Sequence, residues 1–305
     1  MTLLTANSPP PCLIAVVGDV HGQWSQADGE ALKALGVDLV LFVGDFGNED
    51  IAIVGQVAAL ALPKAVVLGN HDAWYSASSQ HRKRCPYDRD KEDRVQQQLD
   101  ALGSSYVGYS KLEVPHHGFT VVGGRPYSWG GPRWRHRRFY RQRCGVASFD
   151  ESAAKIGANI DAAAADTVIF LGHSGPQGLG DRTYDICGRD WKASGGDYGD
   201  PDLAQAIAYA KAQGRRVPLV TFGHMHHALK DDSTRLRTRL VIDPQGTVYL
   251  NAAQVPRVRG DAHSFTLVTL QAGQVQQVRL VWTTQQGKIL SSEELCTAAA
   301  DAAPD

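Results

Sequence analysis

Apolar and polar positions alternate in blocks along the first 70 residues of the chain. Three short apolar runs, rich in β-branched residues, cover 12–19, 37–45 and 64–70, and each run ends in glycine followed by a polar residue. Segments of helical length, around 23–35 and 49–61, separate the runs. Continuous apolar runs of this length are typical of strands that are buried on both faces. The pattern therefore predicts βαβαβ units around a parallel sheet, with functional residues at the carboxyl ends of the strands.

The rest of the chain is less regular but continues the alternation of strands and helices. Ser148 and Glu151 form the capping-box pattern that opens a helix. The pair Asp200-Pro201 opens another helix, which should end near Gly214. Further strands are expected at 119–124, at 166–173, at 217–223 and in several segments after residue 238, and the mixed-charge run 81–94 is expected to begin a solvated helix.

We interpret these elements as one domain of mixed α/β (α+β) class that covers residues 12–290. Its length allows a substantial core, and it contains no solenoid-type repeat. Variable insertions are expected at about 73–118, 125–147 and 174–200, with a flexible N-terminus over 1–11 and a disordered tail over 291–305.

Charge and cysteine content exclude several kinds of protein. The formal net charge is −1, so there is no global attraction to nucleic acid or to an anionic membrane. The five cysteines are odd in number and scattered, which argues against a disulfide framework and against a thiolate zinc site. The N-terminus lacks the segments of a secretory signal, and no apolar run approaches the roughly 20 residues that span a bilayer. We therefore expect a cytoplasmic globular protein with no membrane partner.

Side chains that can bind metal follow five successive apolar runs. In "VVGDVHG" and in "FGHMHH" two such residues are two positions apart, so they face the same way if the chain is extended. A turn at the end of a strand explains any one of these residues, but it does not explain why all five runs carry aspartate, asparagine or histidine. The residues are Asp19, His21, Asp45, Asn70, His71, Asp72, His173, His224 and His226.

The mixture of oxygen and imidazole donors indicates the kind of ion. It suits a divalent first-row transition ion, with manganese expected first and iron, zinc, cobalt or nickel as alternatives, rather than calcium. The donors are too many for one ion. Two ions ~3.5–4 Å apart and bridged by a carboxylate would use them all, and such centres hydrolyse phosphoesters and amides.

These motifs resemble the calcineurin-like metallophosphoesterase superfamily. The pieces "GDVHG", "GDF", "GNHD", "GHS" and "GHMH" occur in the order of the family pattern and span residues 14–228. The resemblance implies a four-layer αββα sandwich with the site at the top of the sheets. It also implies a hydrolase that acts on phosphoric ester bonds.

The same resemblance implies a role for each residue. His71 would stabilise the transition state and protonate the leaving oxygen. The family often carries an acid three residues after the bridging aspartate, but this chain has Asn48 there, which leaves the orientation of the site open. The first ion would be held by Asp19, His21, Asp45 and His226, with Asp45 as the bridge, and the second ion would be completed by Asn70, His173 and His224.

The expected reaction is in-line attack on phosphorus by a hydroxide that bridges the two ions, with His71 as the acid. Asp72 is expected to orient the His71 imidazole, with capping of a turn as the alternative. His227 is expected to be a solvent-exposed neighbour rather than a further ligand. A surface position is expected for four further histidines outside the motifs, His81, His116, His117 and His136.

Two segments outside the motifs are candidates for substrate recognition. Residues 125–143 contain seven arginines, no lysine and no acidic residue, interleaved with aromatic residues. Arginine matches phosphate oxygens and aromatic rings stack on bases, although an exposed basic loop or a surface for a partner explains the composition equally well. The loop 174–200 is long enough to form a lid with Tyr184 or Trp191. The candidate substrate contacts are Arg135, Arg137, Arg138 and Arg182.

Three functions follow from these observations. The leading one is a metal-dependent phosphoesterase that hydrolyses a phosphate mono- or diester of a small metabolite or nucleotide. The second is a nuclease or a phosphoprotein phosphatase that uses the arginine-rich segment, with nucleic acid as a less favoured partner. The third is a regulatory scaffold that retains the fold without catalysis, and it is disfavoured because every ligand and the leaving-group histidine are present.

Overall fold

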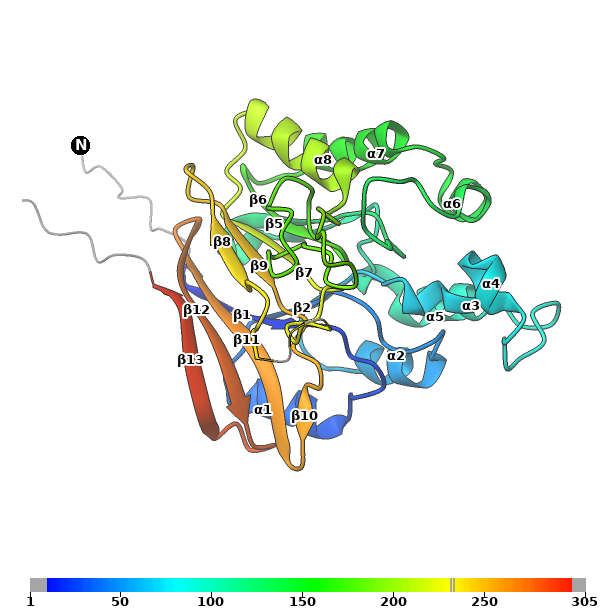
Figure 1. Ribbon diagram of the computed structural model, residues 1–305. Helices are drawn as coiled ribbons and strands as arrows, with labels where there is room; N and C mark the ends of the chain where they lie inside the picture. The colour runs from blue at the N-terminus through cyan, green and yellow to red at the C-terminus, as the bar shows by residue number, and fades with distance from the viewer. Residues whose placement is uncertain (1–9, 231, 233, 298–305) are drawn as a thin grey trace, which may run out of the picture.

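Two β-sheets lie face to face at the centre of the molecule, with helices on their outer sides (Figure 1). The computed structural model describes residues 10–230, 232 and 234–297. In the first sheet the strand order is β13-β12-β11-β1-β2-β3, with β10 beside β11. Its strands are β1 (Cys12–Val17), β2 (Leu39–Phe42), β3 (Lys64–Val66), β10 (Val258–Arg259), β11 (Ala262–Gln271), β12 (Gln274–Thr283) and β13 (Ile289–Thr297).

The second sheet has the order β4-β5-β6-β7-β9-β8. Its inner strands are parallel, as are β1, β2 and β3 of the first sheet, so their carboxyl ends point to one edge of the sandwich. The strands are β4 (Lys111–Val114), β5 (Phe119–Gly123), β6 (Thr167–Leu171), β7 (Leu219–Phe222), β8 (Leu240–Ile242) and β9 (Val248–Asn251).

Alternate side chains of each central strand enter different cores. In β1, Ile14 and Val16 join the core between the sheets, while Ala15 and Val17 join the core that the helices cover. Both faces of the strand are therefore buried, which explains why its sequence is continuously apolar. The mixed α/β class and the layered sandwich that the family resemblance implied are confirmed.

Helices cover the outer faces of both sheets. Figure 1 shows α1 and α2 on the side of the first sheet, and α7 packed with α8 over the second. Ser148 caps α7 as expected, since its hydroxyl accepts a hydrogen bond from Glu151 N at 3.2 Å. The α-helices are α1 (Gln26–Ala34), α2 (Ile51–Ala58), α3 (Trp74–Ala77), α4 (Ser79–Arg82), α5 (Arg94–Leu102), α6 (Arg137–Cys144), α7 (Phe149–Asp161) and α8 (Pro201–Ala212), and the 3₁₀ helices are η1 (His71–Ala73), η2 (Gly103–Ser105) and η3 (Pro115–His117).

Two expectations about local structure were wrong. The mixed-charge run 81–94 forms mainly turns between α4 and α5, because Pro86 disfavours a helix around it and Asp93 caps the helix that starts at Arg94. We expected the disordered tail to begin at residue 291, which is too early. Strand β13 continues to Thr297, because β12 offers it a full antiparallel edge. Residues 1–9 and 298–305 of the expected flexible ends lie outside the described residues.

Every helix in the part of the chain that the structure describes is too short or too polar to cross a lipid bilayer.

Candidate metal centre

Side chains that follow β1, β2, β3, β6 and β7 meet at one edge of the sandwich. The donor atoms of each group lie within 4.8 Å of one another, and Asp45 and His21 each belong to two groups. The structure therefore brings together the side chains that the five apolar runs placed at their ends. The groups are Asp19 with His21 and His226, Asp45 with His173 and His224, and His21 with Asp45 and His71.

The glycines at the strand ends leave room for this convergence. A Cβ atom on Gly69 would lie 2.3 Å from Asp45 Oδ1 and 2.6 Å from His173 Nδ1. A Cβ atom on Gly223 would lie 2.2 Å from Asp19 Oδ1. Any larger residue at either position would occupy the space of a carboxylate, which explains the glycine at these two strand ends.

His173 presents an unprotonated nitrogen to two oxygen acceptors. Its Nδ1–H donates to the carbonyl of Val43 at 2.7 Å, since a carbonyl only accepts. Burial lowers the pKa of His173 to about 4, so the ring is neutral near pH 7 and its Nε2 carries a lone pair. That nitrogen lies 3.0 Å from Asn70 Oδ1 and 3.3 Å from Asp45 Oδ1. Two oxygens and one imidazole nitrogen therefore converge on one point, where a bound cation would be a partner for all three.

Donor atoms are crowded in the same way around Asp19. Its Oδ2 atom is buried and lies 3.1 Å from His226 Nε2. The Nε2 atoms of His21 and His226 are only 3.2 Å apart. Burial alone raises the pKa of Asp19, but the neighbouring imidazoles outweigh it and hold that pKa well below its usual range. An ionised carboxylate beside two imidazole nitrogens is a donor set that divalent transition ions accept.

Asp45 lies between the two groups. Burial raises its pKa well above the usual value, and the carboxyls of Asp19 and Asp72 raise it further. Its Oδ1 atom accepts the backbone N–H of His71 at 2.8 Å, so a backbone donor fixes the position of the carboxyl group. A cation is the natural partner for such a buried acid. The residues present therefore fit divalent ions on both sides of Asp45.

His71 is oriented by Asn48. The ring Nδ1–H donates to Asn48 Oδ1 at 2.6 Å, and the ring stacks on Trp74 with centroids 4.2 Å apart. Burial is the main cause that lowers the pKa of His71 to about 3, with the nearby imidazoles adding to it. The amide that replaces the common acid at position 48 thus supplies the orientation that the sequence left open, but it supplies no charge.

Asp72 does not contact the His71 ring, so its expected orienting role was wrong. Its buried carboxylate accepts the backbone N–H groups of Gly69, Asp45 and Phe46 at 2.6, 2.9 and 2.9 Å. It therefore ties the loop after β2 to the loop after β3. The sequence could not distinguish the two roles, because a carboxylate next to a histidine suits either one.

Other histidines differ from the surface positions that we expected. His227 is buried, and its Nε2–H donates to the Asn251 carbonyl at 2.9 Å, so it is a structural residue and not a solvent-exposed neighbour. His81 stacks on Trp74 at 3.9 Å between centroids, and Trp74 stacks in turn on Trp129. These aromatic rings form one wall beside the centre.

A cavity of about 380 Å³ opens onto the centre. Aromatic rings dominate its sides, and Arg135 and Lys230 add positive charge. Arg135 donates to the hydroxyl of Tyr198 at 2.9 Å. The sequence indicated Arg135, the aromatic residues of 125–143 and Trp191, but it gave no signal for Trp74, Tyr198 or Lys230, which lie outside the motifs. The aromatic lining residues are Trp74, Trp129, Trp191 and Tyr198.

The arginines of residues 125–143 lie in different parts of the structure. Arg135 lines the cavity, whereas Arg137 and Arg138 line a separate groove beside α6. Arg125 is buried and pairs with Asp200 and Asp202 at the start of α8, so it serves the fold. The seven arginines therefore do not form one phosphate-binding surface.

The long loop 174–200 is anchored rather than free. Arg237 donates from Nη1 to the carbonyl of Asp185 at 2.9 Å and from Nε to the carbonyl of His226 at 2.9 Å. Trp191 reaches the cavity from this loop, but Arg182 is exposed and donates to the hydroxyl of its neighbour Tyr184. The structure thus joins the loop to the centre through Arg237 and leaves Arg182 outside it.

Comparisons with known proteins agree with this geometry. A family model described as calcineurin-like phosphoesterase matches residues 13–228. Among solved structures, a dimetal phosphatase from Danio rerio is similar at 12% identity and a TM-score of 0.50, over 94% of this chain and 99% of that chain. A metallophosphoesterase from Sphaerobacter thermophilus is similar at 17% identity and a TM-score of 0.33, over 85% and 84%. A search of curated proteins found no significant match.

The free energies of unfolding of two variants can distinguish the role of Asp72 from that of Asn48. We expect Asp72→Asn to lower the free energy of unfolding by about 2–5 kcal/mol, because an amide nitrogen then faces buried N–H donors. Asn48→Ala should change it by no more than about 0.5 kcal/mol, because that side chain is exposed. Urea unfolding of the metal-free proteins measures both, and equal stability of the two variants would contradict the structural role of Asp72.

Proposed function

Because the chain belongs to the calcineurin-like phosphoesterase family and is a metal-dependent hydrolase of phosphoester bonds, we propose that its substrate is a small phosphate mono- or diester that carries a planar group, such as a nucleotide. The observation that carries the proposal is the aromatic cavity that opens onto the centre. Its volume of about 380 Å³ suits a compact molecule.

We assign the ligands as two sets that share Asp45. Manganese is the ion proposed for both positions, since oxygen and imidazole donors dominate. Bound divalent ions supply the charge that activates water and offsets the charge that develops on phosphate. One set is Asp19, His21, Asp45 and His226, and the other is Asp45, Asn70, His173 and His224.

His71 is proposed to deliver a proton to the leaving oxygen. Its Nδ1 is held by Asn48 and its ring is held by Trp74, so Nε2 is the atom left to act. Without substrate the ring is neutral, because burial lowers its pKa. A bound phosphate brings the opposite charge that raises this pKa and favours the imidazolium form.

The cavity walls are proposed to select the rest of the substrate. A planar group can stack on Trp129 or Trp191, and Arg135 is placed to bind an oxygen of the ester. A nuclease or a phosphoprotein phosphatase would use the arginines of residues 125–143 as one binding surface. The separation of Arg137 and Arg138 from the cavity supports the small substrate instead.

Metal content tests the ligand assignment. The protein, stripped with a chelator and reloaded with manganese, should hold two ions per chain and hydrolyse phosphoesters. Asp45→Ala should lose both ions most readily, because Asp45 is the proposed shared ligand. Elemental analysis after desalting measures this, with His116→Ala, an exposed histidine outside the centre, as the control. One ion in the wild-type protein would contradict the second set.

Leaving-group dependence tests His71. We expect His71→Ala to keep the metals but to lower kcat by about 10²–10⁴ for an alkyl phosphate, the usual contribution of a positioned acid. The loss should be smaller for p-nitrophenyl phosphate, whose leaving group hardly needs a proton. Equal losses for both esters would argue for charge stabilisation without proton transfer.

A second variant checks the same role through pH. Asn48→Asp puts a carboxylate beside the ring and should raise the pKa of His71. An acid must be protonated to act, so activity on the alkyl ester should persist to higher pH in this variant. An unchanged alkaline limb of the pH profile would count against His71 as the acid.

Arg135 and Arg138 form a matched pair for the substrate. Arg135→Ala should raise KM several-fold for a nucleotide substrate with kcat little changed, because it removes binding that is equal in ground and transition states. Arg138→Ala should leave both constants unchanged, since that side chain lies in the separate groove. Steady-state kinetics measures both variants. An effect of Arg138→Ala alone would favour a nuclease or a phosphoprotein phosphatase, whose larger substrate reaches the separate groove.

A further inference from the structure

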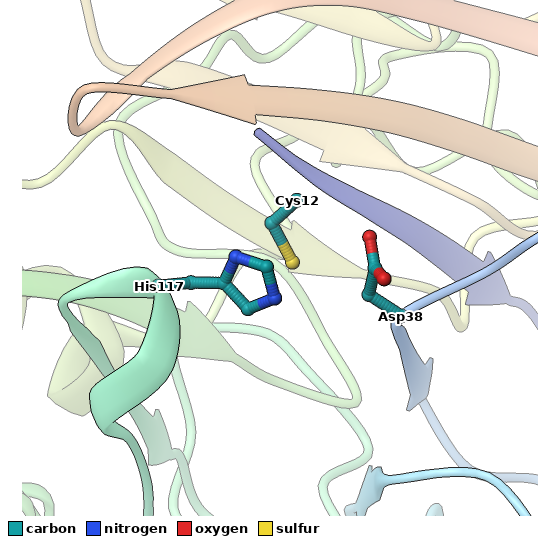
Figure 2. Close-up of side chains that lie close together, drawn as sticks. All are labelled: Cys12, Asp38 and His117. Atoms are coloured by element: carbon teal, nitrogen blue, oxygen red, sulfur yellow. The ribbon is translucent and has the colours of Figure 1, made fainter. Parts of the chain in front are cut away.

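A second group of potential metal ligands lies at the opposite end of β1. Cys12 begins this strand and the catalytic residues follow its other end, so roughly 17 Å of strand separates the two places. Asp38 directly precedes β2, and His117 ends η3, which connects β4 to β5. The donor atoms of the three side chains lie within 4.8 Å of one another. Figure 2 shows the thiol between the imidazole ring and the carboxylate.

Two of these side chains are already held by the backbone. The Nδ1–H of His117 donates to the carbonyl of Pro10 at 3.2 Å, which leaves Nε2 as the ring nitrogen that can bind a metal ion. One oxygen of Asp38 accepts the N–H of Leu13 at 2.8 Å, and the backbone N–H of Asp38 donates to the Leu13 carbonyl at 2.9 Å. Backbone partners of this kind orient the ligands of known metal sites.

The thiol of Cys12 faces this pair from the buried side. It is 1% exposed, and burial together with the nearby Asp38 raises its pKa to about 12. His117 is partly exposed and Asp38 is exposed, so the group is open to solvent on one side. An ion therefore has a path of entry, and a fourth position remains for water.

We propose that Cys12, Asp38 and His117 form a zinc site that is separate from the catalytic centre. One sulfur, one nitrogen and one oxygen donor suit zinc, whereas magnesium and calcium take oxygen alone. The thiol releases its proton to solvent as the sulfur–zinc bond forms. Because β1 belongs to one sheet and η3 connects two strands of the other, the ion would join the two sheets at the edge away from catalysis.

The absorption of bound cobalt can distinguish this site from the catalytic centre. A thiolate bound to Co²⁺ gives an intense near-ultraviolet charge-transfer absorption, whereas the described ligands of the catalytic centre offer only oxygen and nitrogen. Titration of the metal-free full chain with Co²⁺ should produce this band and saturate it once the catalytic positions are also filled, and added Zn²⁺ should remove it. Cys12→Ser should abolish the band, whereas Cys85→Ser, which changes a cysteine outside the group, should retain it.

Two further variants, Asp38→Asn and His117→Gln, test the site independently in case Cys12→Ser does not fold. Asp38→Asn keeps an oxygen for Leu13 but removes the charge, and it should weaken Co²⁺ binding at this site at least tenfold. His117→Gln should weaken it similarly, and His116→Gln, next to it in the chain, should not. No band at saturating Co²⁺, or a band that survives Cys12→Ser, would overturn the proposal. Phosphoesterase activity of manganese-loaded Cys12→Ser should be unchanged, so the result does not depend on the proposed substrate.

Discussion

The centre of this protein depends on the close approach of donor atoms that repel one another unless a proton or a cation lies between them. Nε2 of His173 faces oxygens of Asn70 and Asp45, and the Nε2 atoms of His21 and His226 lie 3.2 Å apart. A folded chain can hold such an arrangement only if strong secondary structure forces it or if cations relieve it. Here the parallel strands of two sheets force it, and the divalent ions that the family implies would relieve it.

Backbone clamps hold the loops that carry these donors. The carboxylate of Asp72 binds three N–H groups from the loops after β2 and β3, and Arg237 joins the long loop to the backbone of His226. Arg125 performs a similar task at the start of α8. In each case a buried charged group meets several backbone or charged partners, so removing it leaves unpaired groups behind. The loops that carry the donors are therefore held by residues that lie outside the proposed ligand sets.

The two ends of β1 have different chemistry for a common structural reason. Each end of a central strand comes close to loops from the opposite sheet, so polar side chains placed there can converge. At the carboxyl end the convergence includes Asp19, and at the amino end it includes Cys12 with Asp38 and His117. We expected no thiolate zinc site because the scattered cysteines lack the spacing of sites that use several of them, and the proposed site departs from this expectation. A site with one cysteine has no such spacing.

Local patterns in the sequence were sufficient for the strands, for the glycines that end them and for the donors that follow. Burial on both faces makes a strand continuously apolar, and a glycine next to a carboxylate is required by close approach, so both features are legible in single segments. Only the tertiary structure decided that Asn48, and not Asp72, orients His71, and that Arg135 reaches the cavity without Arg137. It alone paired the polar strand β13 with β12. These outcomes depend on contacts between residues far apart in the chain, and the direction of a side chain across such a contact has no local signature.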